Sequence, residues 1–282
     1  MIRLVATDLD GTLLRSDLTV SNRTREALAR ARDHALPVVF MTGRPLRWLD
    51  AAIAETQHRS MVACANGALI WNASTQQAGA VHRLDPRTAI SVADLLRSLI
   101  PDIGFAVERL PHAAASWTDV VGSSHPFFAC DERYVPRWPL PPNTPIAPVE
   151  ELVSEGGVVK LLARAPIERD HTADSLLALT RSALRGLVDV THSNSADLLL
   201  EMSAYGVNKG TALADIADHY DVDRTEVAAI GDMPNDASML DWAGRAYAVS
   251  NAHPDVVQAA DDVLPSNDED GVATLIESIL PN

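Results

Sequence analysis

Residues 2–14 read IRLVATDLDGTLL and carry the first clear signal of the fold. A short apolar run over 2–7, rich in residues that favour strands, ends directly at Asp8, which is typical of a buried parallel strand. Gly11 follows shortly after, and a glycine permits the sharp backbone turn that the end of such a strand requires. The stretch therefore predicts a parallel sheet whose first strand delivers a carboxylate to the sheet edge.

The next elements repeat this design. Ser21 is a suitable cap for a helix over roughly 22–34, and VVFM at 38–41 predicts a second apolar strand. A helix over about 45–56 and a third strand, MVAC at 61–64, complete the series. Strands and helices that alternate at this spacing imply right-handed crossovers and a parallel sheet.

The pattern changes after about residue 84 and resumes near residue 190. Between these points we expect helices over 86–100 and 168–185, strands over 104–109, 114–121, 158–165 and 187–192, and a proline-rich connection over 136–148. Beyond them we expect strands over 198–202, 227–232 and 246–250, a short strand at DVLP (262–265), and helices over 208–220, 254–260 and 270–280. The prediction is an α/β fold. A Rossmann-like parallel-sheet core is formed by residues 1–84 and 191–282, with an α+β cap domain, residues 85–190, inserted between them.

The composition is that of a globular protein and argues against several functions. The chain has 282 residues, 47% apolar and 22% charged, enough for one large domain or two modest ones. Its formal net charge of −15 disfavours nucleic acid and membrane surfaces as partners, because both are bound through clustered Lys and Arg. The two cysteines lack CxxC spacing, which argues against a disulfide framework and a zinc site. With no signal peptide or membrane span in the pattern, we expect a cytoplasmic protein.

Three predicted core strands end in polar clusters, DLDGT (8–12), TGR (42–44) and GDMPND (231–236). Ligands of open parallel sheets bind beyond the carboxyl ends of the strands, so these clusters should form one site. Asp8, Asp10 and Asp232 would then converge, and three carboxylates without a counter-ion repel and raise one another's pKa. A hard divalent cation relieves that repulsion, and ligation by oxygen alone favours Mg²⁺.

The remaining polar groups suit phosphate. Thr42 offers a hydroxyl and Gly43 a backbone N–H, while Lys209 at the start of a helix offers a cation. Asp8 would attack phosphorus and form an aspartyl-phosphate. Asp10 would protonate the leaving oxygen and then deprotonate the water that attacks the intermediate. These residue types predict phosphoryl transfer.

Four segments in this order and spacing, DLDGTLL, TGRP, GVNKG and GDMPND, resemble the four motifs of the haloacid dehalogenase superfamily. The insertion between the second and third resembles the large α/β cap of its Cof-type phosphatases, and ANGALI at 65–70 resembles a segment that this branch carries just before the cap. The resemblance covers about 1–84 and 190–282, and the cap matches only in place and size. It implies a phosphomonoester hydrolase that uses Mg²⁺.

The resemblance also implies a role for each candidate residue. Asp8 would be the nucleophile, Asp10 the general acid and base, and the metal ligands would be Asp8, the backbone carbonyl of Asp10, and Asp232. The phosphate ligands would be Thr42 and Lys209, beside the Gly43 N–H, with Asn235 contacting phosphate or orienting the site. Asp236 would support the metal shell or Lys209. Apart from the resemblance, Arg44 in the TGR segment would reach the substrate or a cap residue, or only brace its own loop.

Two other functions remain open from the sequence: a phosphomutase, which passes the phosphoryl group to a second hydroxyl, and a regulator that binds a phosphorylated ligand without catalysis. The expected partner is a small phosphorylated metabolite, but the residues do not select among a sugar phosphate, a nucleotide and a phosphorylated cofactor. The candidate contacts in the predicted cap are Arg109, His112, Trp117, Arg133, Arg137 and Trp138. The oligomeric state is also open.

Overall fold

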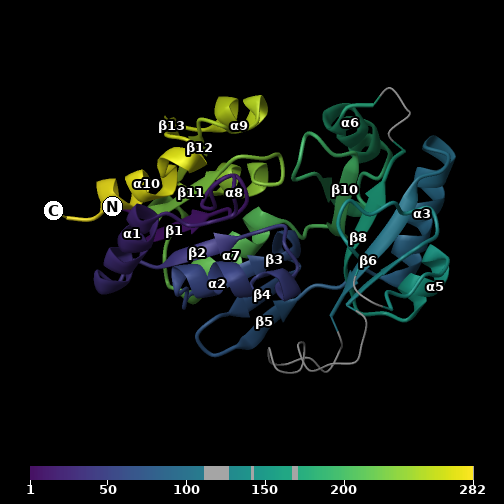
Figure 1. Ribbon diagram of the computed structural model, residues 1–282, viewed down its shortest axis with the longest axis horizontal. Helices are drawn as coiled ribbons and strands as arrows, with labels where there is room; N and C mark the ends of the chain where they lie inside the picture. Colours follow the sequence, from purple (N-terminus) through teal and green to yellow (C-terminus); the bar gives the residue numbers. More distant parts are fainter. Residues whose placement is uncertain (111–126, 141–142, 167–170, 282) are drawn as a thin grey trace. The chain divides into compact units, whose positions relative to one another are not determined.

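The computed structural model describes residues 1–110, 127–140, 143–166 and 171–281, and every structural statement below concerns these residues. They divide into two compact units, shown in Figure 1. The first unit consists of Met1–Gly79 and Asn208–Asn282, and the second of Ala80–Val207. Within the described ranges, we find no helix with the length and apolar character needed to cross a membrane.

The first unit is built on an eight-stranded sheet with the order β13-β12-β11-β1-β2-β3-β4-β5. Its strands are β1 (Leu4–Thr7), β2 (Val38–Met41), β3 (Met61–Cys64), β4 (Leu69–Asn72), β5 (Gln77–Val81), β11 (Val227–Gly231), β12 (Arg245–Val249) and β13 (Asp262–Leu264). The strands from β13 to β3 run parallel, and β4 returns antiparallel to β3. The predicted α/β fold with a parallel-sheet core is thereby confirmed.

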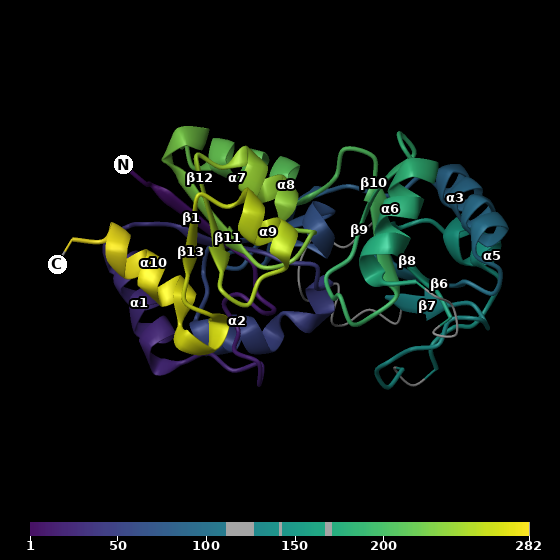
Figure 2. The same ribbon diagram turned by 90° about the horizontal axis from the view of Figure 1, so that it is seen from above.

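Helices cover both faces of this sheet. They are α1 (Asn22–Asp33), α2 (Asp50–Thr56), α7 (Lys209–His219), α8 (Ala237–Trp242), α9 (Pro254–Ala259) and α10 (Gly271–Ile279). Figure 2 shows α7 and α8 on one face of the sheet and α1, α2 and α10 on the other. The Ser21 hydroxyl caps α1 as predicted by accepting a hydrogen bond from the Thr24 amide at 2.9 Å.

Short 3₁₀ turns complete the unit: η1 (Leu46–Trp48), η2 (Ala65–Gly67), η3 (Arg224–Glu226) and η4 (Asn267–Glu269). The helix predicted over 45–56 is therefore split into η1 and α2. A 3₁₀ turn places residues three apart on one side, and here it buries both Leu46 and Leu49.

The second unit holds a five-stranded antiparallel sheet with the order β7-β6-β8-β10-β9. Its elements are α3 (Pro86–Leu99), β6 (Gly104–Arg109), β7 (Phe128–Cys130), α5 (Val149–Ser154), β8 (Val158–Arg164), α6 (Ala173–Ala183), β9 (Val188–Thr191) and β10 (Leu199–Ala204). One apolar cluster joins the three helices to the sheet and includes Leu96, Phe105, Leu161, Leu176 and Met202. The strand predicted over 114–121 lies outside the described residues, as do the first residues of the helix predicted over 168–185.

One predicted element belongs to a different unit. The strand predicted at 198–202 was assigned to the core, but β10 pairs with β8 and β9 in the second unit. Four consecutive residues, 200–203, are buried, so the strand reads like a buried parallel strand although its neighbours are antiparallel. The structural division falls after residues 79 and 207, whereas the predicted cap spans 85–190.

Candidate active site

The ends of three neighbouring strands bring distant parts of the sequence together. β1 pairs in parallel with β11 on one side and with β2 on the other. Asp8, Thr42 and Asp232 each come directly after one of these strands. Parallel strands share one carboxyl edge, so the three polar clusters predicted to meet there do so.

Lys209 is the cation of this edge. It begins α7, where the Asn208 side chain caps the helix by accepting from the Thr211 amide. The Lys209 side chain is fully buried, and its Nζ donates to Asp8 Oδ1 at 2.5 Å and to Asp236 Oδ1 at 2.6 Å. Burial alone would lower the pKa of Lys209, but the carboxylates of Asp236 and Asp8 outweigh it and raise the pKa above its ordinary value. The ammonium therefore stays charged.

A buried cluster of carboxylates surrounds this ammonium. Asp8, Asp232 and Asp236 each contribute an oxygen, and these oxygens lie within 4.8 Å of one another. Burial raises the pKa of the Asp8 carboxyl well above 3.8, because Lys209 offsets only part of the desolvation and the other carboxylates add repulsion. Burial and the charge of Asp236 raise the pKa of Asp232 to about 7, although a hydrogen bond from Thr12 Oγ1 opposes this shift. The donor set consists of oxygen atoms, which fits a hard divalent cation.

The carboxylate of Asp10 has a different partner from the one expected. Sequence reasoning grouped it with Asp8 and Asp232, but in the structure the third carboxylate of the cluster is Asp236. Asp10 instead accepts two hydrogen bonds from Arg44, from Nε at 2.7 Å and from Nη2 at 2.5 Å. The hydrogen bonds to Asp10 raise the pKa of the Arg44 guanidinium against the effect of its burial. Asp10 remains 45% exposed, so a substrate oxygen can reach it.

Two glycines allow the loops to approach so closely. Gly11 has a φ of +78°, and a Cβ at this position would lie 2.4 Å from Asp232 Oδ2. A Cβ at Gly231 would lie 2.5 Å from the carboxyl carbon of Asp236. Asp236 in turn accepts hydrogen bonds from the backbone amides of Asp232 and Met233, each at 2.9 Å. The carboxylates are thus held by backbone as well as by Lys209.

The predicted phosphate ligands lie along the same edge. Thr42 Oγ1 accepts a hydrogen bond from the Arg44 amide at 3.0 Å, and Gly43 stands between these two residues in the turn after β2. Asn235 Nδ2 donates to Asn66 Oδ1 at 3.2 Å. Among the described residues, Asn235 Oδ1 is a buried oxygen with no hydrogen-bond partner.

Sequence reasoning missed two residues of the site. Thr12 Oγ1 holds Asp232 at 2.8 Å, and Asn66 holds Asn235 from a left-handed conformation with a φ of 58°. Thr12 belongs to the quoted DLDGT segment, but its partner lies 220 residues away and no local signal indicates it. The ANGALI segment at 65–70 is identified from the sequence only by its resemblance, which gives Asn66 no role in the site.

The candidate contacts of the second unit have structural partners of their own. Arg109 is buried and donates to Glu155 and to the Leu152 carbonyl. Arg137 donates to the Ala196 carbonyl at 3.0 Å, and Trp138 packs beside the Phe128 ring. His112 and Trp117 lie outside the described residues.

Comparison with known proteins agrees with this fold. The family profile described as haloacid dehalogenase-like hydrolase matches residues 5–118 and 154–276, and the chain belongs to this family. The 5-amino-6-(5-phospho-D-ribitylamino)uracil phosphatase YwtE of Bacillus subtilis is 28% identical, with 99% of this chain and 98% of that protein covered. The HMP-PP phosphatase of Citrobacter koseri is also 28% identical, over 91% of this chain and 87% of its own length.

A solved haloacid dehalogenase-like hydrolase from B. subtilis shares the fold. Its TM-score is 0.77 at 24% identity, and 99% of this chain and all of that chain are covered. The predicted resemblance to this superfamily is confirmed, and so is the prediction of a phosphomonoester hydrolase of its type.

Proposed function

We propose that the protein hydrolyses a small phosphomonoester with the help of Mg²⁺ and through an aspartyl-phosphate at Asp8. The observation that carries this proposal is the position of Asp8, buried at the end of β1 with Lys209 on one of its oxygens. Lys209 keeps that carboxylate in one orientation and opposes the negative charge of an approaching phosphoryl group.

Asp8 would attack phosphorus while the bond from phosphorus to the leaving oxygen breaks. Asp10 would give its proton to that oxygen and later take one from the water that hydrolyses the aspartyl-phosphate. The exposure of Asp10 supports this role, since its carboxyl must reach both the leaving group and the water. Thr42, the Gly43 amide and Asn235 would hold the phosphate oxygens.

Arg44 has to release Asp10 before this chemistry begins. A guanidinium bonded to both oxygens of Asp10 favours the carboxylate, whereas a general acid needs the protonated form. The anionic phosphate is the group best able to attract Arg44 away. On leaving Asp10, the Arg44 guanidinium would then bind the phosphate and become a substrate contact.

The residues present fit Mg²⁺. The ligands would be Asp8, Asp232 and the backbone carbonyl of Asp10, with Asp236 holding Lys209 and the amides of the Asp232 turn. When bound, the ion would neutralise the crowded carboxylates and polarise the phosphoryl group. Burial and mutual repulsion raise the pKa of Asp8 and of Asp232, and a cation bound at this position would favour the ionised form of both.

The decisive experiment measures phosphate release from a panel of phosphomonoesters in Mg²⁺ and in EDTA. The panel includes an aryl phosphate, sugar phosphates, nucleotides, 5-amino-6-(5-phospho-D-ribitylamino)uracil and HMP-PP, the last two because relatives bear their names. We expect turnover that requires the metal and disappears in Asp8→Asn. Turnover that persists in Asp8→Asn would contradict the proposed nucleophile.

The same assay separates the alternatives. A phosphomutase would convert its substrate into an isomer without accumulating free phosphate. A regulator would bind phosphorylated ligands in the panel without turnover in any metal. The paired acid Asp10, available beside the nucleophile, favours the hydrolase over the regulator.

A further inference from the structure

Two asparagines near the C-terminus of the first unit hold the loop that follows the nucleophile. Asn251 Nδ2 donates to the Gly11 carbonyl at 2.8 Å, and Asn251 Oδ1 accepts from the Asn267 amide at 2.9 Å. Asn267 Nδ2 then donates to the Leu14 carbonyl at 2.9 Å. Asn251 holds the Gly11 end of the loop 11–14, Asn267 holds the Leu14 end, and the two asparagines are bonded to each other. We refer to these two side chains as the asparagine clamp.

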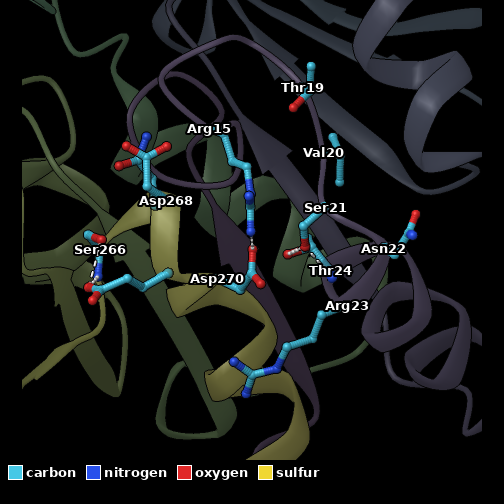
Figure 3. A network of polar contacts seen from close by, with 12 residues as sticks. Arg15, Thr19, Val20, Ser21, Asn22, Arg23, Thr24, Ser266, Asp268 and Asp270 are labelled. Carbon is cyan, nitrogen blue, oxygen red and sulfur yellow. Dashed lines mark hydrogen bonds and ion pairs between the residues drawn. The ribbon is translucent and has the colours of Figure 1, made fainter.

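On the surface, an ion pair and two hydrogen bonds also join residues 15 and 16 to residues 268 and 270. Figure 3 shows the ion pair. Arg15 Nη2 lies 2.9 Å from Asp270 Oδ1, and Asp268 accepts from the amide and the hydroxyl of Ser16 at 2.9 and 2.7 Å. Exposed ion pairs contribute little on their own. Asn267 is only 5% exposed, and a hydrogen bond to a buried carbonyl cannot be exchanged for water, so the Asn267 bond to Leu14 should contribute more than these exposed ion pairs.

The clamped loop touches the catalytic groups directly. Gly11 follows Asp10 and packs against Asp232, and Thr12 donates to the same carboxylate. His253, two residues after Asn251, also contacts Asp232 directly. Its backbone amide donates to the Asp232 carbonyl at 2.7 Å. Residues 251–253 thus hold the backbone at Gly11 and at Asp232, the two residues that meet beside the carboxylate cluster.

We propose that Asn251 and Asn267 are positioning residues for the phosphoryl-transfer site. They act through the loop 11–14 and hold Asp10 and Asp232 in position relative to Asp8. The inference rests on the proposed function, since it assigns these residues to the same reaction. Small displacements of reacting groups lower rates strongly while leaving binding of the substrate nearly unchanged.

The cleanest test is Asn251→Asp. Asn251 is exposed, so folding tolerates the change, and the new carboxylate still accepts from the Asn267 amide. It loses the N–H donor, however, and places an oxygen against the Gly11 carbonyl. We expect kcat to fall by about tenfold, KM to stay within about twofold, and the Mg²⁺ concentration for half-maximal rate to rise.

The matched control is Asn22→Asp. Asn22 is exposed at the start of α1 in the same unit, and its side-chain oxygen accepts from Arg25 at 3.0 Å, a contact that the substitution keeps. It adds the same charge without touching the loop 11–14. A kcat of Asn251→Asp within twofold of this control would overturn the inference.

Two measurements do not depend on turnover. Hydrogen exchange at the Thr12 and Leu14 amides, which both donate to the Leu9 carbonyl, should accelerate in Asn251→Asp but not in Asn22→Asp. Mg²⁺ binding by calorimetry should weaken in the same variant. If the wild type releases no phosphate, the proposed function fails. Faster exchange with weaker Mg²⁺ binding then still supports the clamp, while unchanged exchange or unchanged Mg²⁺ affinity overturns it.

Discussion

Replacing Asp232 with Asn should stabilise the metal-free protein at pH 8. Burial and repulsion raise the pKa of this carboxyl from 3.8 to about 7. The folded protein therefore keeps a proton between about pH 4 and pH 7 that the unfolded chain releases, so the free energy of unfolding decreases as the pH rises through this window. A pKa increase of this size corresponds to about 4 kcal/mol, at about 1.4 kcal/mol for each tenfold change in acidity.

The variant should recover about half of that free energy. Asn carries no charge, but it is a weaker acceptor than a carboxylate for the Thr12 hydroxyl, and a hydrogen bond to a charged group contributes about 1.5–3 kcal/mol. A net gain of about 2 kcal/mol would raise the unfolding midpoint by roughly 4–8 °C. The measurement is thermal unfolding in EDTA at pH 5 and pH 8, where the gain should appear at pH 8 and shrink at pH 5.

Asp223→Asn is the control in the same unit. Hydrogen bonds from Thr225 lower the pKa of the exposed Asp223, so removing its charge should leave the midpoint unchanged or slightly lower it at pH 8. The reasoning is refuted if Asp232→Asn lowers the midpoint in EDTA at pH 8. It is equally refuted if the gain of Asp232→Asn over the wild-type protein is as large at pH 5 as at pH 8.

Three further predictions concern the same site. Mg²⁺ should raise the unfolding midpoint more at pH 8 than at pH 5, because its ligands must be ionised; an equal rise at both values in a thermal-shift titration would contradict this. Gly11→Ala should abolish the thermal shift with Mg²⁺, since its Cβ would lie 2.4 Å from Asp232 Oδ2; a normal shift would show that the loop moves freely. Lys209→Met should cost about 3–5 kcal/mol in urea unfolding, because it leaves Asp8 and Asp236 buried without their cation. Its kcat/KM should also fall by about 10²–10³, and a stable, active variant would remove Lys209 from the site.

Much of the fold and of the site could be predicted because the signals are local. An apolar run that ends at Asp8 reports both a buried strand and its edge, and the same holds for the run before Asp232. β10 was misplaced because the leucine run of LLLEM, followed by an acidic residue, is similar to the apolar runs that end at Asp8 and Asp232 and carries no information about its neighbours. Strand partners depend on the whole chain, and a six-residue pattern cannot encode them.

The orientation of the side chains in the site was harder to predict from the sequence. That Asp10 turns to Arg44, and that Asp236 joins the acidic cluster, depends on rotamers and on loops that meet only in the folded core. Thr12 and the clamp residue Asn267 contact groups more than 200 residues away. Polar residues of these types are common in loops, so nothing in their immediate sequence distinguishes them from solvated turns.

The sheet order also sets the time at which the site comes into existence. β1 lies between β2 and β11, so the strand that leads into Asp8 gains one of its two neighbours only after residue 227 has been made. At about 5–20 residues per second, translation separates Asp8 from Asp232 by roughly ten to forty-five seconds. The continuous second unit, Ala80–Val207, is synthesised completely within that interval. During synthesis Asp8 is therefore present before Lys209, Asp232 and Asp236 exist, and the buried carboxylate cluster forms only as one of the last events of folding.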